Sequence, residues 1–176
     1  MDALEILRQM HVEAKSAFQQ IAHAGPDQRG GLWAKLRPEL ELHEQLEERF
    51  VYDPMTKDVG SRDTLLAGWD QRHHTQVAEA KSMMEEIGRL EPRESRWLQM
   101  VGQLQMTLER HIQTEENEIW PRIRQVWGTD KLEQASGPMQ AAKTAGSAGA
   151  AVSGAMGQAG EAIKGAFGGS REEPAA

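Results

Sequence analysis

The sequence predicts an all-α protein: an antiparallel up-down-up-down four-helix bundle followed by a Gly/Ala-rich, disordered C-terminal tail. Apolar residues recur at steps of three and four through residues 1 to 130, and strand-like alternation is almost absent there. Four such segments with fairly short connections are typical of a helix bundle. We therefore expect a bundle over residues 1–130 and a low-complexity tail over residues 131–176.

The first two predicted helices are separated by a glycine-rich loop at residues 24–31. Asp2 and Glu5 have the spacing of a capping box, which marks the start of the first helix. Each predicted helix has one stripe, meaning the row of residues that should face the core of the bundle. In the first helix the stripe is Leu4, Leu7, His11, Ala14, Phe18 and Ile21. The stripe of the second helix is Leu32, Leu36, Leu40, His43, Glu47 and Phe50 or Val51.

A predicted connection at residues 53–62 leads to the third helix, which ends at Glu91-Pro92. Pro92 suits the first turn of the helix that follows. The third stripe is Leu66, Trp69, His73, Val77, Ala80, Met84 and Ile87, and the fourth is Trp97, Val101, Leu104, Leu108, His111, Glu115 and Ile119 or Glu118. The steps of three and four residues in these stripes fit helices that pack at shallow crossing angles.

The tail differs in composition, because more than half of residues 137–176 are Gly or Ala. Such a segment buries too little apolar surface to offset its chain entropy, so we expect it to be disordered or weakly helical. Val152, Met156, Ile163 and Phe167 have the spacing of a marginal amphipathic helix. A docking or membrane-touching role is the alternative to a flexible tail, although each glycine disfavours a helix by about 1 kcal/mol.

Composition excludes several classes of function. The net charge of −7 argues against nucleic acid as the main partner. Cysteine is absent, which removes disulfides, thiolate metal sites and cysteine nucleophiles. No apolar run approaches the ~20 residues that span a membrane, and the first residues lack the features of a signal peptide, so a cytoplasmic location is expected. The glycines lack the context of a phosphate-binding loop.

A short pattern, His-x-x-x-Glu, occurs twice in similar surroundings, at His43/Glu47 and at His111/Glu115. Residues four apart share one face of a helix, so each copy directs an imidazole and a carboxylate to the same place. Six polar residues lie on the stripes that should face the core: His11, His43, Glu47, His73, His111 and Glu115. This arrangement predicts a metal site.

A lone core histidine usually makes an ordinary hydrogen bond, but four histidines with two carboxylates need another explanation. Two buried carboxylates cost several kcal/mol each unless they are paired, and divalent cations would pair with both. Imidazole and carboxylate without thiolate suit iron, manganese or zinc. Six ligands favour a dinuclear centre, in which Glu47 and Glu115 bridge, His11 and His43 hold one ion, and His73 and His111 hold the other.

Several nearby residues leave alternatives open. His73 and His74 are adjacent, and His73 fits the stripe better, so His74 is the alternative ligand. Glu44 is close enough in sequence to reach an ion, although a solvated flank is the simpler interpretation. The same holds for Glu116 and Glu118, which would tune the site or face water. His23 is expected at the surface.

The segments MDALEILRQMH, HEQLEERFVYDP, RHH and HIQTEENEIWPRI resemble the hemerythrin family, specifically its bacterial HHE cation-binding domains. The resemblance covers residues 1 to about 130. It implies a non-haem di-iron centre bridged by the two glutamates, with His11, His43, Glu47, His73 (or His74), His111 and Glu115 as ligands.

The sequence departs from the oxygen-carrying members of that family. Val77 or Ala78 stands where they have a further histidine, and Glu115 replaces an Asp. We therefore expect a protein that binds two iron ions and binds or senses oxygen, peroxide or nitric oxide, or buffers iron. A di-iron oxidase or peroxidase, and a metal-stabilised interaction module holding zinc, are the alternatives. Trp69 and Trp120 pack near the centre or line a ligand channel.

Overall fold

The computed structural model describes residues 1–167, with side chains described for residues 1–148 except Ser61. In this described part every regular element is helical, which confirms the predicted all-α bundle. The α-helices are α1 (Ala3–His23), α2 (Pro26–Glu47), α3 (Asp53–Val59), α4 (Thr64–Ile87), α5 (Ser95–Thr114), α6 (Trp120–Val126) and α7 (Thr129–Phe167). Two π-helical segments, η1 (Glu48–Tyr52) and η3 (Glu115–Ile119), and one 3₁₀ turn, η2 (Gly60–Arg62), continue the long helices.

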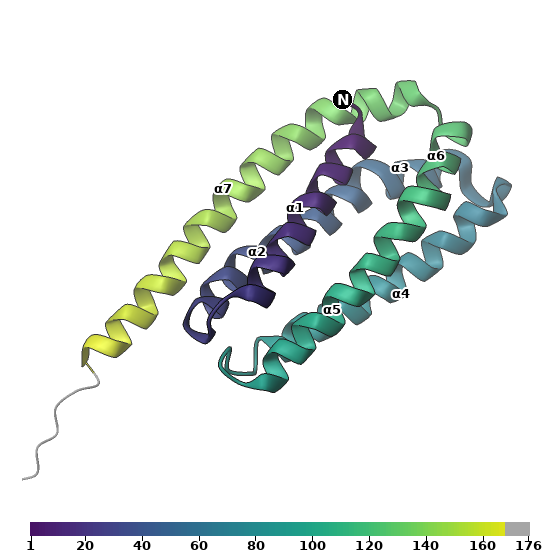
Figure 1. Ribbon diagram of the computed structural model, residues 1–176. Helices are drawn as coiled ribbons and strands as arrows, with labels where there is room; N and C mark the ends of the chain where they lie inside the picture. Colours follow the sequence, from purple (N-terminus) through teal and green to yellow (C-terminus); the bar gives the residue numbers. More distant parts are fainter. Residues whose placement is uncertain (168–176) are drawn as a thin grey trace, which may run out of the picture.

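Two helical hairpins, α1–α2 and α4–α5, form the bundle, and α1 contacts both α2 and α5 (Figure 1). The predicted capping box is present: the Asp2 backbone N–H donates to Glu5 Oε2 at 2.8 Å, and the Glu5 N–H donates to Asp2 Oδ1 at 3.0 Å. The turns of both hairpins lie at the same end. The two hairpins approach each other closely where Gly30 meets Pro92. A Cβ at position 30 would lie 3.2 Å from Pro92 Cγ, so glycine leaves the space that this approach needs.

The helices are longer than the sequence pattern predicts, and the connections are correspondingly shorter. α2 already begins at Pro26, and most of the expected connection at residues 53–62 is α3 and η2. Buried Met55 and Val59 explain this continuation, since their burial stabilises a helix that propensity alone leaves weak. The fourth bundle helix, in contrast, begins later than predicted. Pro92 lies before α5 and not in its first turn.

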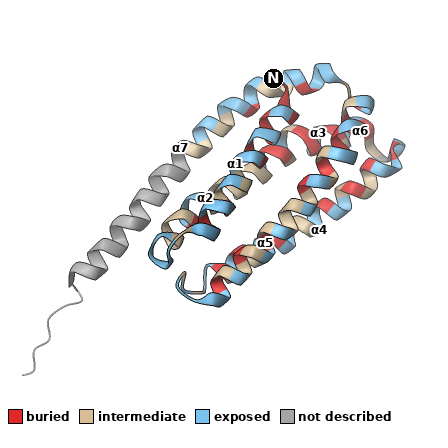
Figure 2. Cartoon of the chain, in the orientation of Figure 1, coloured by how far each residue is buried: buried red, intermediate tan, exposed pale blue. Residues whose placement is uncertain are grey.

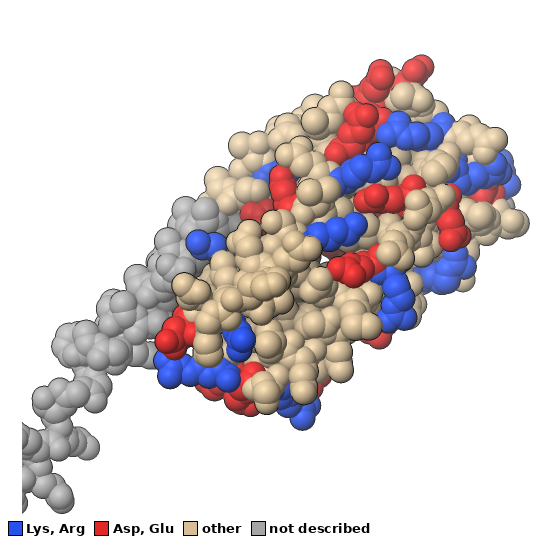
Figure 3. Space-filling view, in the orientation of Figure 1, with Lys and Arg blue, Asp and Glu red and all other residues tan. Residues whose placement is uncertain are grey.

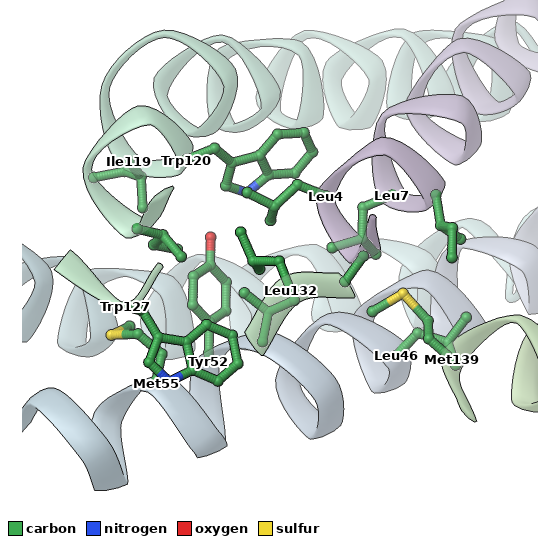
Figure 4. Close-up of a cluster of buried hydrophobic side chains, with 14 of the residues drawn as sticks. Leu4, Leu7, Leu46, Tyr52, Met55, Ile119, Trp120, Trp127, Leu132 and Met139 are labelled. Atoms are coloured by element: carbon green, nitrogen blue, oxygen red, sulfur yellow. The ribbon is translucent and has the colours of Figure 1, made fainter. Parts of the chain in front are cut away.

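A fifth long helix, α7, lies along α1 and α2 (Figure 1). The sequence predicts a disordered or weakly helical tail over residues 131–176, whereas the structure packs the first part of this segment. Leu132 and Met139 are fully buried against Leu4, Leu7 and Leu46 (Figure 4). Gly146 lets α7 approach α2 closely, because a Cβ would lie 2.5 Å from Leu42 Cδ1. The Val152 to Phe167 side chains, and residues 168–176, lie outside the described part.

The polar residues of the predicted site lie between two hydrophobic clusters that follow one another along the bundle. Buried residues, red in Figure 2, occur along the bundle helices toward both of their ends. One cluster surrounds Tyr52 and Trp120, and the other surrounds Phe18 and Trp97. Along each of the four bundle helices, with η1 and η3 counted as the continuations of α2 and α5, the predicted site residues fall between members of the two clusters. The fold therefore brings them to one level of the bundle.

The surface visible in Figure 3 carries basic and acidic side chains side by side, without a continuous basic area. None of the helices in the described residues is both long and apolar enough to cross a membrane.

Candidate metal centre

Each His-x-x-x-Glu motif ends at a π-helical segment: η1 follows Glu47, and η3 begins at Glu115. A π-helical turn inserts one extra residue, and such turns are frequent at functional sites. The buried residues after each glutamate repeat with the same offsets of 4, 5, 8 and 12, namely Val51, Tyr52, Met55 and Val59 in one half, and Ile119, Trp120, Ile123 and Trp127 in the other. The duplication seen in the sequence therefore extends to the backbone and to the packing around it.

The structure brings all six predicted ligands together. The side chains of Glu47, His73 and Glu115 have no exposed surface, and His11 is 3% exposed. The side chains of His43 and His111 are 15% and 10% exposed. Four of the six, Glu47, His73, His111 and Glu115, offer donor atoms that all lie within 4.8 Å of one another.

Glu115 lies at the middle of this group. Its Oε1 is 3.0 Å from His111 Nε2 and 3.9 Å from His73 Nδ1, and its Oε2 is 3.6 Å from His11 Nε2. The Tyr52 hydroxyl donates a hydrogen bond of 2.8 Å to Glu115 Oε1. Glu115 thus faces three histidines from three different helices.

Glu47 holds the corresponding position in the first half. Its Oε2 lies 3.7 Å from His43 Nε2, and His43 Nε2 lies 3.2 Å from His11 Nε2. Within the described part of the chain, neither Glu47 oxygen has a hydrogen-bond partner, and neither ring nitrogen of His73 has one. Buried polar atoms are nearly always satisfied. The unsatisfied donor set therefore fits a divalent cation, for which these atoms are suitable ligands.

Two of the four histidines meet an oxygen acceptor on the ring nitrogen that points away from the centre. His11 Nδ1 lies 2.8 Å from Glu116 Oε1, and His111 Nδ1 lies 2.8 Å from Gln76 Oε1. Such an acceptor favours the proton on the outer nitrogen and leaves the inner lone pair free for a metal, a common arrangement around metal-bound histidines. His73 Nε2 lies 3.2 Å from Glu44 Oε1 without the geometry of a hydrogen bond.

These partners alter the sequence-based interpretation of the nearby acids. Glu44 and Glu116 are both partly buried and contact candidate ligands, so neither is simply a solvated flank, whereas Glu118 is exposed. Gln76 was missed entirely, although it follows His73 by three residues and therefore lies on the same face of α4.

Gln76 provides a test of this orienting role. We expect Gln76→Ala to weaken metal binding by about 10- to 100-fold, because His111 loses the acceptor that fixes its proton. A competition titration with a chromogenic chelator measures the change. The exposed neighbour on the same helix, Gln71→Ala, is the matched control and should bind metal as the parent chain does. Equal affinities in both variants would contradict the role of Gln76.

Buried aromatic rings hold the histidines in place. Trp120 stacks on His11 at 5.0 Å between centroids, and Trp69 stacks on His111 at 5.4 Å. Tyr52 meets His73 edge-on at 4.5 Å. Because these rings leave little room for rotation, the imidazoles are positioned before any ion binds.

Burial dominates the electrostatics of the site. It raises the pKa of Glu115 to about 7, against the opposing hydrogen bond from Tyr52, and raises the pKa of Glu47 well above its usual value, assisted by the charge of Glu115. Burial lowers the pKa of His11 to about 3 and that of His43 well below its usual value. The metal-free His11 and His43 are therefore neutral, as metal binding requires. At His73, burial is outweighed by contact with Glu44 and the charge of Glu47, which raise the pKa.

The remaining two histidines lie apart from the centre. His74 is 57% exposed and faces Glu48, so the structure places His73 in the cluster and His74 at its edge. His23 is exposed, as expected.

Comparisons with known proteins concern the family and the fold. The family model of the hemerythrin HHE cation-binding domain matches residues 2–123. The fold is similar to the crystal structure of a hemerythrin HHE cation-binding domain-containing protein from Mycobacterium kansasii. The TM-score is 0.70 at 21% identity, over 85% of this chain and 89% of the other. The search of curated proteins gives no significant match.

Proposed function

Because the chain belongs to the hemerythrin HHE cation-binding family, we propose that it binds two iron ions in this buried cluster and there binds or senses oxygen, peroxide or nitric oxide, or buffers iron. The observation that carries the proposal is the pair of buried carboxylates, Glu47 and Glu115, which face histidines and, among the residues whose side chains are described, pair with no Lys or Arg. Two cations would balance this pair.

The proposed roles follow the distances. Glu47 and Glu115 lie between the two pairs of histidines and would bridge the ions. His11 and His43, whose Nε2 atoms are 3.2 Å apart, would hold one ion, and His73 and His111 would hold the other. Iron would supply redox chemistry and open coordination positions, since six side chains do not saturate two ions.

The protein contributes orientation and exclusion of water. Glu116 and Gln76 fix the ring protons of His11 and His111, and the stacked tryptophans limit movement of the same imidazoles. The Tyr52 hydroxyl oxygen lies 2.8 Å from Glu115 Oε1 and donates to it, which places a proton donor at the carboxylate inside the cluster. That donor favours the second candidate function, a detoxifying oxidase or peroxidase. Nucleic acid and stable membrane insertion are not expected among the partners.

The test is a metal analysis of freshly purified protein together with its optical spectrum. We expect two iron ions per chain and absorption bands that change on exposure to oxygen, peroxide or nitric oxide. Continued consumption of peroxide would favour the enzyme. A zinc-filled protein that responds to none of the three ligands would overturn the proposal and favour the interaction module.

A further inference from the structure

A cavity of about 500 Å³ opens beside the candidate metal centre, between α1, α2, α4 and α5. One end is formed by the site itself, through His11, His43, His111, Glu44 and Gln76. Cavities of about 300 to 1,000 Å³ usually hold organic molecules, whereas a water molecule takes up about 30 Å³. The volume therefore exceeds what oxygen, peroxide or nitric oxide requires.

The cavity is elongated and largely apolar. Its lining on α2 extends from Leu32 to Glu44, about 18 Å at 1.5 Å per residue, and on α4 from Gln76 to Met84, about 12 Å. The walls away from the metal centre are Ala14, Ala17, Phe18, Leu36, Leu40, Val77, Ala80, Leu104, Leu108 and Ile112. Three alanines among these leave the space that larger side chains would fill.

Charged residues surround the rim, and α7 covers part of it. Lys143 of α7 pairs with Glu13 at 3.2 Å, and Ser147 Oγ donates to Glu39 at 3.4 Å. Both residues of α7 border the cavity. The part of α7 that carries these two residues therefore limits access on the side of α1 and α2. Trp69 and Trp120, in contrast, pack on the histidines and do not line the cavity.

We propose that this cavity binds an unbranched aliphatic carboxylate of medium chain length, with its hydrocarbon chain along the apolar walls and its carboxylate at the histidine end. An elongated apolar space suits a hydrocarbon chain, because burial of each methylene is favourable. Oxygen donors of carboxylate type are good ligands for the metals that suit this cluster. The contact of the head group rests on the proposed function, whereas the fit of the chain does not.

Isothermal titration calorimetry with decanoate tests the proposal on the full chain, both iron-loaded and metal-free. We expect one decanoate per chain, tighter binding to the iron-loaded protein, and a change in its optical spectrum. Octanoate should bind about 15-fold more weakly, from roughly fourfold per methylene. Equal affinity with and without iron would overturn the placement of the carboxylate and with it the proposal.

A cavity-filling variant separates the cavity from non-specific binding. Ala80 is 7% exposed and lines the cavity, so Ala80→Phe should reduce decanoate affinity by at least about tenfold through steric overlap. Ala78→Phe on the exposed face of the same helix is the control and should leave affinity unchanged. Ala17→Leu carries the same expectation if Ala80→Phe fails to fold. Unchanged binding in folded cavity variants would overturn the proposal.

The two proposals fail in different ways. If the protein binds two iron ions but no decanoate, only the cavity proposal fails. If iron does not bind, the function proposed above fails, and the carboxylate placement fails with it. In that case, chain-length dependence and the effect of Ala80→Phe on the metal-free protein still decide whether the cavity takes an aliphatic chain.

Discussion

Glu115→Ala is expected to lose most of its bound metal while keeping its helical fold. Glu115 lies within 3.9 Å of three histidines, so its removal takes away the carboxylate on which both halves of the site converge. Buried charged groups stabilise a fold poorly, since desolvation offsets their attraction. We therefore expect little change in the circular dichroism spectrum. Plasma emission spectroscopy of the desalted protein measures the metal.

The matched control is Glu118→Ala, three residues later in the same π-helical segment and exposed. It should retain two ions per chain. His43→Ala tests the other half of the site and should also lose metal, because His43 is the partner of Glu47 in the first motif. Two ions retained by both Glu115→Ala and His43→Ala would show that the cluster is not the metal site.

Metal affinity is expected to fall steeply as the pH is lowered from about 8 to about 5. Burial raises the pKa of Glu115 to about 7, so below that pH the metal-free protein holds a proton that the metal must displace. Each displaced proton lowers the affinity by about tenfold per pH unit. The two units below pH 7 thus give about 100-fold, and the raised pKa of Glu47 makes the fall steeper.

The histidines contribute unequally to this effect. Against its burial, contact with Glu44 and the charge of Glu47 raise the pKa of His73, so His73 also binds a proton as the pH falls. Burial lowers the pKa of His11 to about 3, so His11 stays neutral across the range and does not compete with the metal. Chelator competition at a series of pH values, with proton release followed by an indicator dye in weak buffer, measures the dependence. A constant affinity between about pH 5 and 7 would refute the carboxylate as the titrating ligand.

The sequence was sufficient to predict the features that depend on the helical period and on the repeated motif. The stripe from Leu4 to Ile21 is buried at nearly every position, and the duplicated motif meets at one level of the bundle. These features follow from which residues share a helix face, and that can be read without knowing how the helices pack.

Features that depend on tertiary contacts could not be predicted from the sequence. Gln76 is an ordinary surface-type residue until His111 is placed 2.8 Å away. The π-helical segments insert an extra residue, so a steady period of three and four loses phase after Glu47 and Glu115. The start of α7 is held by Leu132 and Met139, two side chains in a segment whose composition indicates disorder.

Tyr52 and Trp120 occupy equivalent positions, five residues after Glu47 and Glu115. Only Tyr52 has a hydroxyl, and it donates to the glutamate of the opposite half. The duplicated scaffold therefore has broken symmetry: Glu115 has a pKa of about 7, whereas that of Glu47 lies well above its usual value without such a donor. The Tyr52 hydroxyl favours the charged form of Glu115 that a cation requires, and Glu47 has no such donor among the described residues, so the two equivalent positions of the scaffold are chemically distinct.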